Sequence, residues 1–187
     1  MHMAYQFNEL DKEFSAIADR LSQEFATLNT GRASPLVLDL VQVESYGSRM
    51  PIKNVASVSI EDPKTLRIAP WDASLIKEIE KAIQAANLGL SLASDDAGLR
   101  VIFPQLTTES RQRLVKTLKE RLEEGRISVR RSREGVWDDI QAREKNAQMS
   151  EDDKFRAKED LQKRVDGINK KLEEMFEKKE KEILEEK

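Results

Sequence analysis

The chain of 187 residues contains no cysteine, and its only histidine is His2. These absences exclude disulfides, thiol catalysis and cysteine-ligated zinc, and they argue against imidazole catalysis and a His-rich metal site. We expect neither a metal nor a cofactor. No run of consecutive apolar residues is longer than three, so we expect no membrane-spanning segment. The first residues also lack the pattern of a secretory or transit segment. We therefore expect a soluble, cytoplasmic protein.

Proline is absent from both ends of the chain. All five prolines lie between residues 31 and 104, and residues 1–30 and 105–187 contain none. Because proline interrupts the interior of a helix, the two ends of the chain are free to form long helices and the middle is not. This division predicts a discontinuous helical domain of residues 1–30 and 105–187 and a small domain of residues 31–104.

The proline-free ends have the periodicity of amphipathic helices. Residues 3–29, residues 107–148 and a segment that begins after Ser150 each repeat apolar side chains every three or four positions. Thr107 or Thr108 is the expected N-cap of the second helix, and Ser150 starts the third. The three apolar seams are Phe7, Leu10, Phe14, Ile17, Leu21 and Leu28; Leu114, Leu118, Leu122, Gly125, Val129, Ser132, Val136 and Ile140; and Leu161, Val165, Ile168, Leu172 and Met175. Because exposed seams associate, we expect one three-helix bundle.

The middle of the chain has the short alternating patterns of strands. Strands are expected at residues 36–43, 55–60, 66–68, 90–92 and 99–103, with one helix that Asp72 caps and that ends at Asn87 and Gly89. The predicted fold class is α+β: an elongated three-helix bundle with an inserted small β/α/β domain. The chain crosses between the two domains near Gly31 and Arg32 and again near Pro104 and Gln105, so we expect hinges there.

The second long helix carries an excess of positive charge. Between Arg111 and Arg133 there are nine Lys and Arg residues and three acidic residues, a local net charge of +6 in a chain whose net charge is −3. Four of these side chains fall within about 60° of one another around the helix, away from its seam: Lys119, Arg126, Arg130 and Arg133. Arginine suits phosphate oxygens, which favours binding to a nucleic-acid backbone. The alternative is a solvated face with intrahelical ion pairs such as Glu123 to Arg126.

Other candidate features have simpler structural interpretations. The stretch from Gly31 to Pro35 lacks the spacing of a phosphate loop, and we interpret it as a helix C-cap followed by a strand, with a partner-contacting Arg32 as the alternative. The acidic pairs at 95–96 and 138–139 are interpreted as a turn and a solvated helix face. Trp71 is expected in the core. Trp137 lies on the side of the basic residues, where it packs between helices or stacks on a base or a partner.

Several stretches of the chain, in their order and spacing, resemble those of one protein family. They are residues 28–35, 46–47 followed by 51–52, 88–90, 98–101, 104–107, Arg111 with 114–116, 129–133, 150–152 and 178–183. Each stretch is weak alone, and together they resemble the bacterial and organellar ribosome recycling factors over nearly the whole chain. Two positions depart from the family's usual pattern. The family commonly has arginine at the position of Asn29, and after Arg133 it commonly has another basic residue and Asp-Ala-Asn, where this chain has Glu134 to Trp137.

The resemblance implies an L-shaped monomer, tRNA-like in outline, that is a translation factor and not an enzyme. Such a factor binds the ribosome and, with elongation factor G and GTP, dissociates post-termination complexes in protein biosynthesis. The resemblance further implies contact with large-subunit ribosomal RNA through a basic helix face, in which Arg130 and Arg133 occupy the family's basic positions. It also places the family's hinge-proximal arginine at Arg32. The alternative is a helical adaptor that binds a protein partner and has no RNA role.

Overall fold

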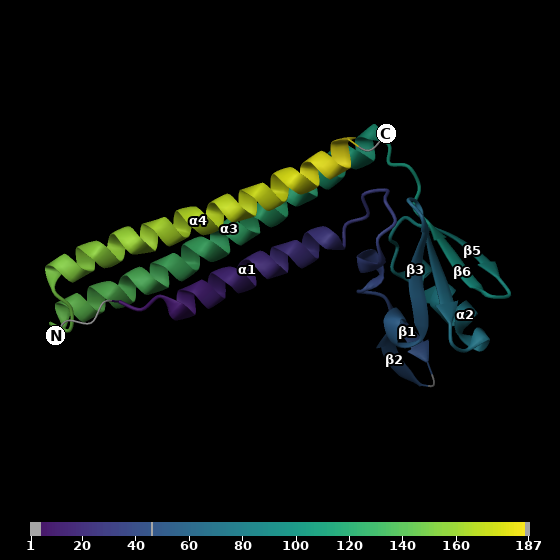
Figure 1. Ribbon diagram of the computed structural model, residues 1–187, viewed down its shortest axis with the longest axis horizontal. Coiled ribbons are helices and arrows are strands. Elements are labelled where there is room, and N and C mark those ends of the chain that lie inside the picture. Colours follow the sequence, from purple (N-terminus) through teal and green to yellow (C-terminus); the bar gives the residue numbers. More distant parts are fainter. Residues whose placement is uncertain (1–4, 46, 186–187) are drawn as a thin grey trace. The chain divides into compact units, whose positions relative to one another are not determined.

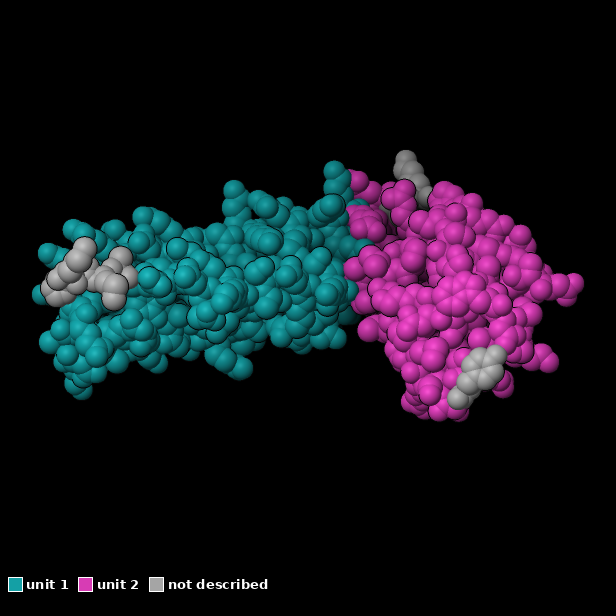
Figure 2. Space-filling view, turned by 60° about the horizontal axis from the view of Figure 1, so that its bottom comes forward, with its two compact units in different colours: residues 1–25, 115–181 teal, residues 26–114, 182–187 magenta. Residues whose placement is uncertain are grey.

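The computed structural model describes residues 5–45 and 47–185. Its contacts separate two compact units, which comprise residues 1–25 with 115–181 and residues 26–114 with 182–187 (Figure 2). The first unit is helical and the second contains the strands, so the predicted α+β class is confirmed. The division of the chain at residues 30/31 and 104/105 remains a prediction. No helix in the described ranges is both long enough and apolar enough to cross a membrane.

Three long helices provide the helical unit: α1 (Asn8–Ala26), α3 (Thr108–Lys145) and α4 (Glu151–Glu185) (Figure 1). Residues 108–114 at the start of α3 and 182–185 at the end of α4 belong to the second unit. The expected caps are present. The Ser110 N–H donates to Thr107 Oγ1 at 3.1 Å, and the Asp153 N–H donates to Ser150 Oγ at 3.1 Å. Between α3 and α4 the chain reverses at Ala147, which has a left-handed φ of 56°. The helix predicted over residues 3–29 is shorter than expected, and residues 3 and 4 of that range lie outside the described residues.

The predicted seams form the core of the bundle. Leu118, Leu122, Val129 and Ile140 of α3 are buried, as are the seam residues of α1 up to Leu21 and those of α4 up to Leu172. Near the end of α4 the buried side chain is Phe176 and not the predicted Met175. A Cβ on Gly125 would lie 3.5 Å from Leu172 Cδ1 and 3.9 Å from Leu21 Cδ2, so all three helices meet at this glycine.

The second unit is built on an antiparallel sheet of four strands in the order β3-β4-β6-β5. These strands are β3 (Ala56–Asp62), β4 (Thr65–Pro70), β6 (Gly98–Ile102) and β5 (Ser91–Asp95). Helix α2 (Ile76–Ala85) buries Ile79 and Ile83 in the same core as Leu66, Ile68 and Val101. A Cβ at Gly98 would lie 2.1 Å from the Ile68 carbonyl oxygen, so β6 requires glycine at its first position.

The strand predicted over residues 36–43 is wrong in its first half. Pro35–Leu38 forms a 3-10 helix, η1, and the strand β1 begins only at Gln42 (Gln42–Ser45) and pairs with β2 (Ser48–Pro51), which the alternation did not indicate. Proline at the first helical position favours a helical turn, because its φ is already fixed near the helical value. The adjacent Val37 and Leu38 are both buried, whereas Leu40 is exposed. The leucines at every second position therefore do not share one face of a strand.

The core position predicted for Trp71 is also wrong, because 70% of this residue is exposed. Its backbone N–H donates to the Val55 carbonyl at 3.2 Å, which fixes the main chain at the end of β4 and leaves the indole outside. The short 3-10 helices η2 (Ile52–Asn54) and η3 (Ala73–Leu75) complete the unit, and Leu75 supplies the buried side chain that follows Trp71. Asp72 caps η3 through a hydrogen bond from the Ser74 N–H at 2.9 Å. The predicted cap is therefore present, but on the 3-10 helix that precedes α2, and the N-cap of α2 itself is Leu75.

Candidate functional site

The candidate nucleic-acid site lies on one flank of α3. We call Lys119, Arg126, Arg130 and Arg133 the basic flank, and the fixed rise and rotation of an unbroken helix place all four on the same side of it. Lys119, Arg130 and Arg133 are exposed. Within residues 5–45 and 47–185, none of these three forms an ion pair or a side-chain hydrogen bond. Their charges are therefore open to an anionic partner.

Arg126 differs from the other three members of the basic flank. Its guanidinium donates to the Glu173 carboxylate of α4, and both side chains are about 40% exposed (41% and 38%). The partner is thus on the neighbouring helix, and the intrahelical pair with Glu123 that the sequence offered as an alternative does not form. Arg126 ties α3 to α4, so the charge that it offers to a partner is reduced.

Trp137 lies between the helices and not on an open face. It is partly buried, and the ammonium of Lys158 on α4 is 5.7 Å from the centre of its ring. This geometry is that of a cation–π contact. Of the two alternatives for Trp137, packing between helices is the one that the structure supports. Gly135 lies in the same segment, Glu134 to Trp137, that departs from the family's usual pattern. It is exposed, and a Cβ at this position would meet no atom within 4 Å.

The residues predicted as hinges fall into two different environments. Gly31 is buried with φ 86°, and its N–H donates to Asn29 Oδ1 at 2.9 Å. Arg32 is exposed. Pro104 and Gln105 are exposed in the coil between β6 and α3, and within the described chain no hydrogen bond or ion pair holds either of them.

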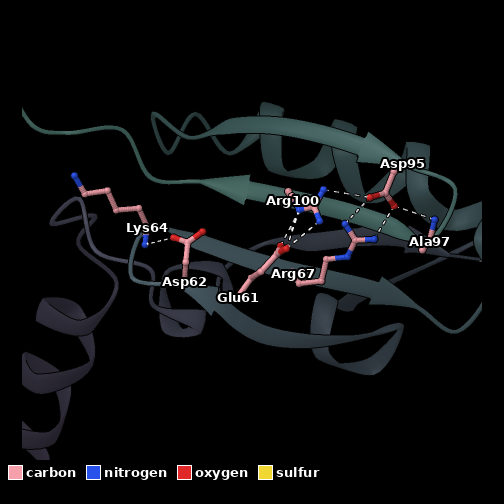
Figure 3. Close-up of polar contacts among 7 residues, drawn as sticks. All are labelled: Glu61, Asp62, Lys64, Arg67, Asp95, Ala97 and Arg100. Carbon is pink, nitrogen blue, oxygen red and sulfur yellow. Dashed lines mark hydrogen bonds and ion pairs between the residues drawn. The ribbon is translucent and has the colours of Figure 1, made fainter.

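The acidic pair at 95–96 turns the chain, as predicted, and Asp95 also organises a polar network on the open face of the sheet (Figure 3). Arg67 donates to both Asp95 carboxylate oxygens at 2.6 Å. Arg100 donates to both carboxylate oxygens of Glu61, with the shortest distance 2.8 Å. The hydrogen bonds from Arg67 and from the Ala97 N–H hold the pKa of Asp95 at about 2, below its ordinary value of 3.8. The four charges cancel, so this network offers no net charge to a partner.

The second acidic pair is only partly a solvated face. Asp138 is exposed, whereas Asp139 accepts hydrogen bonds from the Tyr5 hydroxyl at 2.7 Å and from Arg143 at 2.9 Å. Burial and the hydrogen bond to Asp139 raise the pKa of Tyr5 to about 12. No group of three or more His, Cys, Asp or Glu side chains among the described residues is arranged to hold a metal ion.

Comparison with known proteins identifies the family. The family model described as ribosome recycling factor matches residues 21–184. The chain belongs to the ribosome recycling factor family. Its similarity to the ribosome-recycling factor of Rubrobacter xylanophilus is 40% identity over 178 residues, which cover 95% of this chain and 96% of the relative. With that of Caldicellulosiruptor bescii it is 39% identical over 183 residues, covering 98% and 100% of the two chains.

Solved structures of ribosome recycling factors have the same fold. One is a solution structure with a TM-score of 0.76 and 36% identity, covering 95% of each chain. Another is the Thermus thermophilus ribosome recycling factor, described together with Escherichia coli elongation factor G bound to the E. coli post-termination complex. It has a TM-score of 0.65 and 36% identity over 95% of this chain and 96% of that chain. The family is one of translation factors and not of enzymes, as the resemblance implied.

Sequence reasoning missed two residues that shape the candidate site. Glu173 was overlooked because it lies 47 positions from Arg126, and no local pattern links the two. Asn29 was noted only as a departure from the family. Asparagine side chains often accept a hydrogen bond from the backbone N–H two residues on, so the bond from the Gly31 N–H could have been expected from the sequence.

Proposed function

We propose that this chain acts in the cytoplasm, together with elongation factor G and GTP, to dissociate post-termination ribosomal complexes so that ribosomes are recycled. Membership of the ribosome recycling factor family supports this proposal, as does the similarity to a factor described with elongation factor G and the post-termination complex. In this proposal the chain acts as a monomer, and no covalent chemistry is required of it. Its contribution is to bind and to transmit movement.

The proposed contact with the ribosome is the basic flank of α3 on large-subunit ribosomal RNA. The observation that carries this step is the set of three exposed cations that have no protein partner among the described residues, Lys119, Arg130 and Arg133. Folded RNA is recognised largely through its shape and its phosphates, which suits a rigid helix that presents cations along one side. Arg126 contributes less, because Glu173 already neutralises it.

The salt dependence of binding tests this contact. Three phosphate contacts predict that the logarithm of the affinity falls by about 2 for each tenfold rise in salt, taking roughly 0.7 per contact. The double variant Arg130→Ala and Arg133→Ala is therefore expected to bind 70S ribosomes more weakly at low salt and with a slope smaller by about 1.4. Ribosome binding is measured across a salt series with the wild-type chain alongside.

The matched control removes two positive charges from α4 by Lys163→Ala and Lys170→Ala. Both lysines are exposed and lie near acidic side chains of their own helix, Asp160 and Glu174. This control is expected to keep the wild-type slope. Equal slopes for both double variants and the wild type would remove the basic flank from the proposal. If binding persisted to isolated proteins but not to ribosomes or ribosomal RNA, the helical-adaptor alternative would replace it.

The proposed action also needs movement between the two ends of the chain. The residues proposed as hinges are Gly31 and Arg32 on one connection and Pro104 and Gln105 on the other. The second connection supports this assignment most directly, because Pro104 and Gln105 are exposed and bonded to nothing within the described residues. Breakdown of polysomes by the purified chain, with and without elongation factor G and GTP, tests the overall function. No breakdown in the complete mixture would refute it.

A further inference from the structure

Asn29 connects two segments of the second unit that are far apart in the chain. Its Nδ2 donates to the Leu88 carbonyl oxygen at 3.1 Å, and its Oδ1 accepts from the Gly31 N–H at 2.9 Å. Leu88 lies in the tight turn that follows α2, where Asn87 and Gly89 both have positive φ values of 49° and 67°. The side chain of Asn29 therefore fastens the connection after α1 to the turn between α2 and β5.

The rest of this connection is held to the same unit. Thr30 is 3% exposed, and its hydroxyl donates to Glu182 Oε1 at 3.3 Å. The Ala33 N–H donates to the Pro63 carbonyl at 2.9 Å, and Ala33 is also buried. Residues 29–33 thus have three separate attachments within the unit formed by residues 26–114 and 182–187.

Only asparagine fits the two bonds at this position. One backbone partner is an acceptor and the other is a donor, and asparagine presents both an amide N–H and a carbonyl oxygen on a short side chain. Aspartate would keep the bond from Gly31 but would face the Leu88 carbonyl with a second acceptor. Arginine has donors only, so it would leave the Gly31 N–H without its partner.

We propose that Asn29 is a positioning residue for ribosome recycling: it fixes the start of the proposed hinge at Gly31 and Arg32 to the turn after α2, and so limits how far this hinge bends. The inference rests on the proposed function. Residues 104–106 of the other connection form no hydrogen bond or ion pair within the described residues, so the connection fastened by Asn29 bends less than the other one. A displacement imposed on one unit is then passed to the other with little loss.

The test compares full-length variants of Asn29 with a control asparagine in the same unit. Asn29→Leu removes both hydrogen bonds at a similar size, and Asn29→Asp keeps the acceptor for Gly31. The control is Asn54→Leu, because Asn54 is exposed and its side chain makes no hydrogen bond within the described residues. Amide exchange of Gly31 is expected to accelerate roughly fivefold in Asn29→Leu, and to stay near the wild-type rate in Asn29→Asp and in Asn54→Leu.

The functional readout separates positioning from binding. In Asn29→Leu we expect affinity for 70S ribosomes to stay within about twofold of wild type, while the rate of recycling at saturating factor falls roughly fivefold. A recycling rate equal to that of Asn54→Leu, or a loss that merely follows weaker ribosome binding, would overturn the inference. An unchanged Gly31 exchange rate would do so as well. The wild-type chain could also fail to split ribosomes while Gly31 exchange responds to the variants as expected. That result would refute the proposed function but leave the fastening by Asn29 intact.

Discussion

Single residues decide which charges of this molecule are available to a partner. Arg126 and Arg130 are one helical turn apart on α3, yet Arg126 is bound to Glu173 whereas Arg130 has no protein partner among the described residues. Arg67 and Arg100 on the sheet are likewise engaged by Asp95 and Glu61. Counting charges in the sequence therefore overstates what a phosphate could reach.

The pKa of Asp95 provides a test at this scale. Because Arg67 holds the pKa of Asp95 near 2, the stabilising effect of the network is complete above about pH 4 and is lost as the pH falls towards 2. An NMR titration of the Asp95 carboxyl carbon is expected to give a midpoint near 2 in the wild type and a higher one in Arg67→Gln. The control Arg49→Gln removes an exposed arginine of β2 and is expected to leave the midpoint unchanged. An equal midpoint in the wild type and in Arg67→Gln would show that the ion pair with Arg67 does not set the pKa of Asp95.

The extent to which the candidate site could be predicted follows from helix geometry. A rotation of 100° per residue is a property of every α-helix, so Lys119, Arg130 and Arg133 could be placed on one flank from the sequence alone. The partner of Arg126 could not be predicted, because it depends on how far α4 is shifted along α3. That shift is set by the turn at Ala147, which has a left-handed φ. Alanine rarely adopts this conformation, so the turn could not be predicted from the sequence.

At the scale of elements, the long helices were predictable and the short segments were not. Each helix repeats its seam over several turns, so single exceptions do not hide the pattern. Near the end of α4 the buried position is Phe176, one residue after the predicted Met175. The segment from Leu36 to Val43 contains too few residues to distinguish alternation from a helical turn. Pro35 and the burial of the adjacent Val37 and Leu38 favour the 3-10 helix that the structure has there. Trp71 was misplaced because a residue at the end of a strand has no neighbours in sequence that fix its face.

The buried seam predicts the effect of truncation in the bundle. Leu172 is fully buried beside Gly125, so Leu172→Ala is expected to lower the free energy of unfolding by roughly 2–5 kcal/mol. The matched control is Ile127→Ala on α3, which removes the same number of carbon atoms from a side chain that is 45% exposed, and it is expected to cost less than about 0.5 kcal/mol. Denaturant unfolding measures both variants. Similar losses for the two would contradict the assignment of the seam to the interior.

For the whole molecule, the important property is that each unit has a core of its own. The core of the second unit consists of buried residues between Ala33 and Phe103, and the bundle seams lie elsewhere in the chain. The two cores are therefore separate, although α3 and α4 run without a break from one unit into the other. Separate cores are what the proposed movement between the two ends of the chain requires.

Lengthening one connection tests this mechanical role directly. Insertion of Gly-Ser-Gly-Ser after Gln105 adds a flexible segment where the described chain makes no bonds, so both cores are expected to fold and ribosome binding to stay within about twofold. Recycling with elongation factor G is expected to fall at least tenfold, because the four added residues let the two ends of the chain move independently instead of about a short hinge. The same insertion between Asp96 and Ala97, in the turn that joins β5 to β6, serves as the control for added length. Full recycling activity in the Gln105 insertion would show that this connection does not transmit the movement, and the first connection, fastened by Asn29, would then have to carry it alone.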